Sequence, residues 1–81
     1  MNTIGKGKTV PQHFGQMVKI IRKKRQLTQE DLSEKSDIEV PYISRIETGT
    51  ANPTLKVISA IAVALDAALS DIFSGLEKNT D

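Results

Sequence analysis

A short predicted helix, residues 40–47, presents an unusual outward surface. With Ile43 set toward the interior and a step of about 100° per residue, four residues project from the opposite side: Pro41, Ser44, Arg45 and Thr48. A purely structural surface helix more often carries Lys–Glu pairs four residues apart. This face instead has a single long basic side chain, that of Arg45. Arginine can pair bidentately with guanine, and small side chains can meet thymine methyl groups. The face therefore suits the edges of base pairs in a DNA major groove.

A second short helix must position this face. Thr28 is suited to cap a helix over residues 29–35, and Glu30 and Asp31 in its first turn complement the helix dipole. Residues 36–38 form a tight turn into the helix over residues 40–47. The seam between the two helices is apolar: Leu32, Ile38, Ile43 and Ile46. This arrangement describes a helix-turn-helix, although any corner between two helices can produce the same spacing.

Three further helices are predicted around this pair, which makes the fold class all-α. The first helix runs from Pro11 to about Arg25–Gln26 and buries Phe14, Met17, Val18 and Ile21. The fourth helix covers residues 55–65, with an apolar stripe of Leu55, Ile58, Ile61, Ala62 and Leu65. The last is a short helix capped by Ser70 and anchored by Ile72, Phe73 and Leu76. No strand pattern is present. We expect a compact five-helix bundle over residues 11–76, a flexible basic arm over residues 1–10 and a polar tail over residues 77–81.

Composition excludes several classes of protein. The 81 residues suffice for one small domain. The absence of cysteine excludes disulfides and thiolate metal sites, and fits the cytoplasm. No stretch has the character of a signal peptide or a membrane span. His13, the single histidine, has no partner ligands along the chain, so we expect no enzymatic activity, metal, cofactor or small-molecule substrate.

Charge is distributed unevenly along the chain. Residues 1–27 contain seven basic residues and no acidic one, whereas residues 28–81 contain four basic and ten acidic residues. This asymmetry suggests a polyanionic partner near the basic part. A solvated basic helix end that complements its own dipole explains it equally well. Lys6 and Lys8 in the arm are similarly open to two interpretations, a contact with a DNA minor groove or a solubilising tail.

The ordered motifs resemble the Cro and phage-repressor-like (XRE) family of helix-turn-helix domains. The matching run is Phe14-Gly15-x-x-Val18-x-x-Ile21-Arg22, then Leu27-Thr28-Gln29-Glu30-Asp31-Leu32, then Tyr42-Ile43-Ser44-x-Ile46-Glu47-x-Gly49 and Pro53. It continues through Ile58 to Ala64-Leu65 and ends at Leu69-x-x-Ile72-Phe73. The resemblance covers most of the chain. It implies a lambda-repressor-like fold and sequence-specific binding of double-stranded DNA.

The resemblance also implies roles for particular residues. The residues expected to read bases lie on the second helix of the motif or at its start: Glu39, Val40, Pro41, Ser44 and Arg45. Those expected to contact phosphates are Thr28, Gln29, Tyr42, Thr48, Thr50 and Asn52. Tyr42 is equally suited to packing its ring against the preceding helix. Arg22 and Glu47 match a buried ion pair between the first and third helices, and the alternative for Arg22 is an ordinary basic surface residue.

Four positions depart from the family pattern, of which Ser33, in place of a common alanine, is a mild change. Gln26 and Asp37 stand where glycine is expected, and both tolerate a left-handed backbone less well than glycine. Glu39 stands where the recognition helix often has a serine or threonine cap. Its carboxylate suits the helix dipole, but it should repel phosphates unless it accepts a bond from a cytosine amino group. The base preference is therefore unusual.

A helix-turn-helix alone makes few base contacts, so we expect a homodimer that binds two half-sites. The interface candidates are the apolar residues of the last helix and the loop before it: Ala67, Ala68, Leu69, Phe73 and Leu76. The size suits a restriction–modification controller, a phage or plasmid repressor, or an antitoxin. The alternative is a protein-interaction module of the same fold that does not bind DNA, which acidic Glu39 and the net acidic residues 28–81 would favour.

Overall fold

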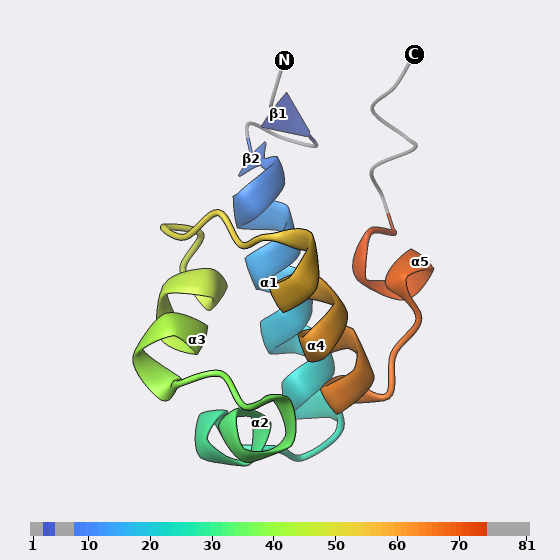
Figure 1. The fold of residues 1–81 in the computed structure, drawn as a ribbon. Coiled ribbons are helices and arrows are strands. Elements are labelled where there is room, and N and C mark those ends of the chain that lie inside the picture. Colours follow the sequence, from blue (N-terminus) through green and yellow to red (C-terminus); the bar gives the residue numbers. More distant parts are fainter. Residues whose placement is uncertain (1–2, 5–7, 75–81) are drawn as a thin grey trace.

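The structure, a computed structural model, describes residues 3–4 and 8–74. It contains five helices in these ranges: α1 (Val10–Lys24), α2 (Gln29–Ser36), α3 (Val40–Glu47), α4 (Leu55–Leu65) and α5 (Leu69–Ile72). Figure 1 shows α1 through the middle of the molecule, with α3 on the left, α2 near the C-terminal end of α1, α4 in front of α1 and α5 on the right. The predicted five-helix fold is confirmed, and α3 and α4 have the predicted bounds.

The core forms where α1 meets the other helices. Fully or almost fully buried side chains come from all five: Phe14, Val18, Ile21, Leu32, Ile43, Ile46, Ile61, Leu65 and Ile72. The predicted stripe of α4 is correct for Ile61, Ala62 and Leu65 but wrong for Leu55, which is 83% exposed. Leu55 lies only about 20° around the helix from buried Ala62, but it is the first residue of α4, and the buried residues of this helix all lie in its second half. Its exposure therefore follows from its place in the first turn and not from the face it occupies.

Two short strands precede α1. Strands β1 (Thr3–Ile4) and β2 (Lys8–Thr9) pair antiparallel, so the expectation of no strand is wrong. Two-residue strands are too short to show the alternation by which a strand is predicted. The Thr9 hydroxyl accepts a bond from the Gln12 N–H at 3.3 Å, and Gln12 Oε1 accepts one from the Thr9 N–H at 3.0 Å. This capping box starts α1 at Val10, with Pro11 in the first turn.

The cap predicted for the last helix is also wrong. Ala68, not Ser70, is the N-cap of α5, and Asp71 Oδ2 accepts a bond from the Ala68 N–H at 3.3 Å. This bond is the reciprocal half of a capping box and satisfies the Ala68 N–H, whereas the alanine side chain offers no acceptor to the first turn. Phe73 follows α5 and stacks on Phe14 of α1, with ring centroids 5.5 Å apart. Leu76 and residues 77–81 lie outside the described residues.

Three helix ends adopt a left-handed backbone without glycine. Gln26 has φ of 60°, Asp37 of 61° and Asp66 of 53°. Gln26 and Asp37 are the two positions at which the sequence departs from an expected glycine. A left-handed residue with a Cβ atom costs about 1–2 kcal/mol, which glycine avoids.

We therefore expect Gln26→Gly to stabilise the protein. The relief of strain, less the greater entropy that glycine gives the unfolded chain, should raise the free energy of unfolding by about 0.5–1 kcal/mol. Urea denaturation followed by circular dichroism measures the change. Gln16→Gly is the matched control, because Gln16 is exposed within α1 and glycine should there cost about 1 kcal/mol. A loss of stability in both variants would contradict the strain at Gln26.

Candidate nucleic-acid interface

The outward face of α3 is polar and open to solvent. Pro41 and Arg45 are exposed and Ser44 is half-buried, whereas Ile43 and Ile46 on the opposite side are buried in the core. Thr48, at the C-cap, is exposed. Glu39, the N-cap residue, is exposed and makes no side-chain capping bond. Its carboxylate is therefore available to a partner outside α3.

Arg45 is supported by its neighbour Tyr42. The guanidinium carbon lies 5.9 Å from the centroid of the Tyr42 ring, which is within the range of a cation–π contact. Tyr42 is half-buried and packs against the core, as the ring-packing interpretation expects. This contact restricts the Arg45 side chain before any partner binds. Less conformational entropy is then lost when the guanidinium pairs with another group.

The loop after α3 is held by hydrogen bonds to one backbone carbonyl group, that of Arg45. The N–H of Thr50 donates to the Arg45 carbonyl oxygen at 2.9 Å, and the Thr48 and Thr50 hydroxyls lie 3.1 and 3.2 Å from the same oxygen. Gly49 supplies the left-handed residue of this turn, with φ of 81°. The threonine hydroxyls were predicted to contact phosphates, but here they face the turn itself. Asn52 is exposed, so its amide is the better-placed donor of the loop.

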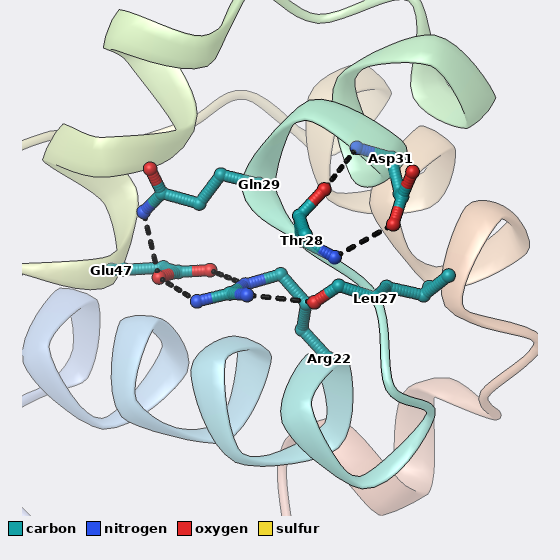
Figure 2. Close-up of polar contacts among 6 residues, drawn as sticks. All are labelled: Arg22, Leu27, Thr28, Gln29, Asp31 and Glu47. Atoms are coloured by element: carbon teal, nitrogen blue, oxygen red, sulfur yellow. Dashed lines mark hydrogen bonds and ion pairs between the residues drawn. The ribbon is translucent and has the colours of Figure 1, made fainter.

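Arg22 and Glu47 form an ion pair between α1 and α3, at the position that the family resemblance implied. Arg22 Nε donates to Glu47 Oε2 at 2.7 Å and its NH2 nitrogen donates to Oε1 at 3.1 Å. The Arg22 NH1 nitrogen donates to the Leu27 carbonyl oxygen at 2.8 Å. The side chains are 9% and 3% exposed, respectively. Figure 2 shows that the guanidinium thereby joins α1 to both α3 and the loop before α2.

Gln29, at the start of α2, reaches the same carboxylate. Its Nε2 atom donates to Glu47 Oε1 at 3.0 Å, as Figure 2 shows. This contact was not predicted, because the sequence analysis assigned the Gln29 side chain to a phosphate. The two functions are compatible, since an amide nitrogen carries two protons and only one is donated to Glu47. The second remains for an external acceptor.

The N-terminus of α2 is built by a capping box. The Thr28 hydroxyl accepts a bond from the Asp31 N–H at 2.9 Å, and Asp31 Oδ2 accepts one from the Thr28 N–H at 2.9 Å. The Thr28 backbone N–H, and then its hydroxyl, lower the pKa of Asp31. The capping box leaves the N–H groups of Gln29 and Glu30 directed out of the helix end, where helices bind anions.

The predicted dimer residues have mixed environments. Ala68 and Leu69 are exposed, whereas Ala67 and Phe73 are half-buried and pack against the core. Phe73 is partly engaged by its stacking on Phe14. Further exposed apolar side chains, which the prediction did not include, are Ile20, Leu55 and Val63.

His13 contacts the protein's own backbone. Its Nε2 atom lies 2.8 Å from the Ser74 carbonyl oxygen. Within residues 3–4 and 8–74, no group of three or more acidic, histidine or cysteine side chains could hold a metal ion. The same part of the chain contains no helix long and apolar enough to cross a membrane.

Two short helices joined by a tight turn, with the second exposing a polar face beside the N-terminus of the first, define a helix-turn-helix protein. The family model described as Helix-turn-helix matches residues 18–72. The chain belongs to the XRE family of such domains, which includes Cro and the phage repressors.

Known relatives include repressors and controller proteins. The chain is 43% identical over 58 residues to the immunity repressor protein of Bacillus phage phi105, a match that covers 72% of this chain and 40% of the repressor. It is 38% identical over 66 residues to the control protein C.MunI of Mycoplasma sp, covering 80% and 89% of the two chains. The chain therefore spans less than half of the phage repressor and most of the control protein.

Solved structures of controller proteins share the fold. The restriction–modification controller C.AhdI from Aeromonas hydrophila has a TM-score of 0.76 at 31% identity, covering 79% of this chain and 97% of that one. The controller C.Esp1396I, crystallised as a tetramer with its natural 35-base-pair operator, has a TM-score of 0.78 at 32% identity. This match covers 88% of this chain and 93% of that one.

Proposed function

We propose that this protein is a sequence-specific, double-stranded DNA-binding regulator of transcription, a dimeric repressor or autoregulator of the controller type. The observation that carries the proposal is the exposed polar face of α3, which lies beside the N-terminus of α2. A controller protein of the same fold forms a complex with its operator, which supports this function. The protein would act in the cytoplasm and would have no catalytic activity.

In this proposal α3 enters the major groove and the start of α2 holds the backbone. Arg45, supported by Tyr42, would pair with a guanine, and Glu39 would accept a bond from a cytosine amino group. The free proton of the Gln29 amide and the N–H groups at the start of α2 would hold a phosphate. Asn52 would add a phosphate contact from the loop after α3. Base and backbone contacts thus come from adjacent elements.

Dimerisation would use the exposed apolar side chains of α4 and α5. Leu55, Val63 and Leu69 are all exposed in the single chain. Covering such side chains favours association by about 25 cal/mol per Å² of apolar surface. The two-fold symmetry of a dimer would place two copies of α3 in successive major grooves about one helical turn apart.

Selection of bound duplexes from a random pool tests the function directly. A DNA-binding dimer should enrich one palindromic sequence with two half-sites. Its affinity should also fall steeply with salt, because each neutralised phosphate contributes roughly 0.9 to the slope of log K against log salt. The alternative, a protein-interaction module, would enrich no sequence and retain no duplex at low salt.

We expect Arg45→Ala to weaken binding to the selected duplex by about 1–3 kcal/mol, which is roughly 5- to 150-fold. The loss should be confined to one base position of each half-site, where the variant would accept any base. Titration of duplexes with single substitutions measures this. Lys35→Ala removes a positive charge from the exposed C-terminal turn of α2 and is the control for charge alone. Equal weakening on every sequence would show that Arg45 contacts only phosphate.

A further inference from the structure

The basic residues of α1 divide into those engaged within the fold and those free to meet a partner. Arg22 is paired with Glu47. Arg25 donates to the Leu65 and Asp66 carbonyl oxygens at 2.8 and 2.9 Å, where it caps the C-terminal end of α4. Three exposed lysines remain on α1: Lys19, Lys23 and Lys24. Structural needs therefore explain the two arginines but not the lysines.

The contact between α1 and α3 fixes the direction in which each lysine points. A Cβ atom on Gly15 would overlap the Ile46 carbonyl oxygen, so at this point the backbones of the two helices are in direct contact. Gln12, one turn earlier, lies against Gly49 at the end of α3, and Arg22, two turns later, reaches Glu47. The line from Gln12 through Gly15 to Arg22 is thus the face of α1 that meets α3.

Two of the three lysines lie beside this line, on the side away from the core. With Gly15 at zero, Lys19 and Lys23 lie at about 40° and 80°, and Gln16 at about 100°. The core residues Phe14 and Val18 lie in the opposite direction, at about −100° and −60°. Gln16, Lys19 and Lys23 therefore form a stripe, here named the α1 stripe, that continues the solvent-facing surface of α3. Lys24, at about 180°, points away from α3.

The charge around the α1 stripe is positive throughout its own segment. Residues 1–27 contain no acidic residue. The carboxylate of Glu47, on the neighbouring helix, is 3% exposed and accepts bonds from Arg22 and Gln29. Its charge is compensated within the fold, so it does not neutralise the lysines. A polyanion that lies on α3 would meet this uncompensated charge next.

We propose that the α1 stripe binds the DNA sugar–phosphate backbone flanking the base pairs that α3 contacts. The inference rests on the proposed function and extends its interface from α2 and α3 to the middle of α1. Lys19 and Lys23 each neutralise one phosphate, and Gln16 donates from its amide. These contacts carry no base preference, because a phosphate is the same at every position. They add affinity and lengthen the bound segment of each half-site.

Salt titrations of three single variants test the proposal on the duplex selected above. Lys19→Gln and Lys23→Gln should each reduce the slope of log K against log salt by roughly 0.9, equally on specific and unrelated duplexes. Lys24→Gln removes the same charge from the opposite side of the same helix and should leave the slope unchanged. Because all three side chains are exposed, the variants should unfold like the parent, which circular dichroism verifies.

Phosphate ethylation interference gives a second readout. In the parent, ethylation of phosphates outside the half-site should inhibit binding, and this inhibition should disappear in Lys19→Gln or Lys23→Gln but persist in Lys24→Gln. If the parent binds its duplex while all three variants keep its salt slope and interference pattern, the proposed backbone contact of the α1 stripe is overturned and the proposed function is not. A parent that retains no duplex would overturn the proposed function as well.

Discussion

Replacing Glu47 with alanine should lower the free energy of unfolding by about 3–5 kcal/mol, because it leaves a buried guanidinium without its counter-charge. Arg22 is 9% exposed on its side chain, and the carboxylate receives two of its hydrogen bonds as well as one from Gln29. A domain of this size has a total stability of roughly 4–12 kcal/mol, so the variant should be largely unfolded at modest urea concentrations. Urea denaturation followed by circular dichroism measures the loss.

Two further variants separate the buried pair from a general effect of charge. Glu30→Ala removes an exposed carboxylate and should cost less than about 1 kcal/mol. The double variant Arg22→Met/Glu47→Leu removes both charges and should recover much of the stability, since a buried pair is commonly replaceable by apolar side chains. If Glu47→Ala were no less stable than Glu30→Ala, Glu47 would have no part in fixing α3.

The second large effect is expected from a single methyl group on α1. Gly15→Ala should lower the free energy of unfolding by about 3 kcal/mol, because the new Cβ atom would overlap the Ile46 carbonyl oxygen and force α1 and α3 apart. The sign of this change in the free energy of unfolding is informative, because replacing glycine by alanine in a solvated helix would instead stabilise the protein by about 1 kcal/mol. Since α3 carries the face proposed to read bases, the folded fraction should also bind its duplex more weakly.

Thermal and urea unfolding measure the stability of Gly15→Ala, and titration at a temperature where the variant is folded measures its affinity. Gln16→Ala is the adjacent control: Gln16 is exposed, so this change should be close to neutral for stability. A Gly15→Ala variant as stable as Gln16→Ala would contradict the close approach of the two helices.

Much of the fold could be predicted because local signals agreed with one another. Apolar spacing and threonine caps located α2 and α4, and Gly49 marked the end of α3. The start of α5 was mispredicted because Ser70 is by type a better cap than Ala68. The N-cap is nevertheless Ala68, whose own N–H donates to the Asp71 carboxylate three residues later. The exposure of Leu55 follows from its place in the first turn of α4. Helical periodicity identifies the face of a residue but does not take its distance from the helix end into account.

The polar contacts around α3 were harder to predict, because they join residues distant in sequence. The family resemblance implied the Arg22–Glu47 pair, but nothing in the sequence indicated that Gln29 would share its carboxylate. Likewise, Thr48 and Thr50 look like phosphate donors from their types, although their hydroxyls face the Arg45 carbonyl oxygen. Arg25 counted only as one more base, and its contact with the end of α4 spans 40 residues of chain.

The separation of α3 into an anchored side and an exposed side has a consequence for engineering. Glu47, Ile43 and Ile46 fix the helix, whereas Pro41 and Arg45 are exposed on its other side and Ser44 is half-buried between them. Substitutions in the second set should leave the buried contacts of the first set in place. The helix can therefore accept a library of new surface residues, from which proteins with chosen operator preferences could be selected without redesigning the scaffold.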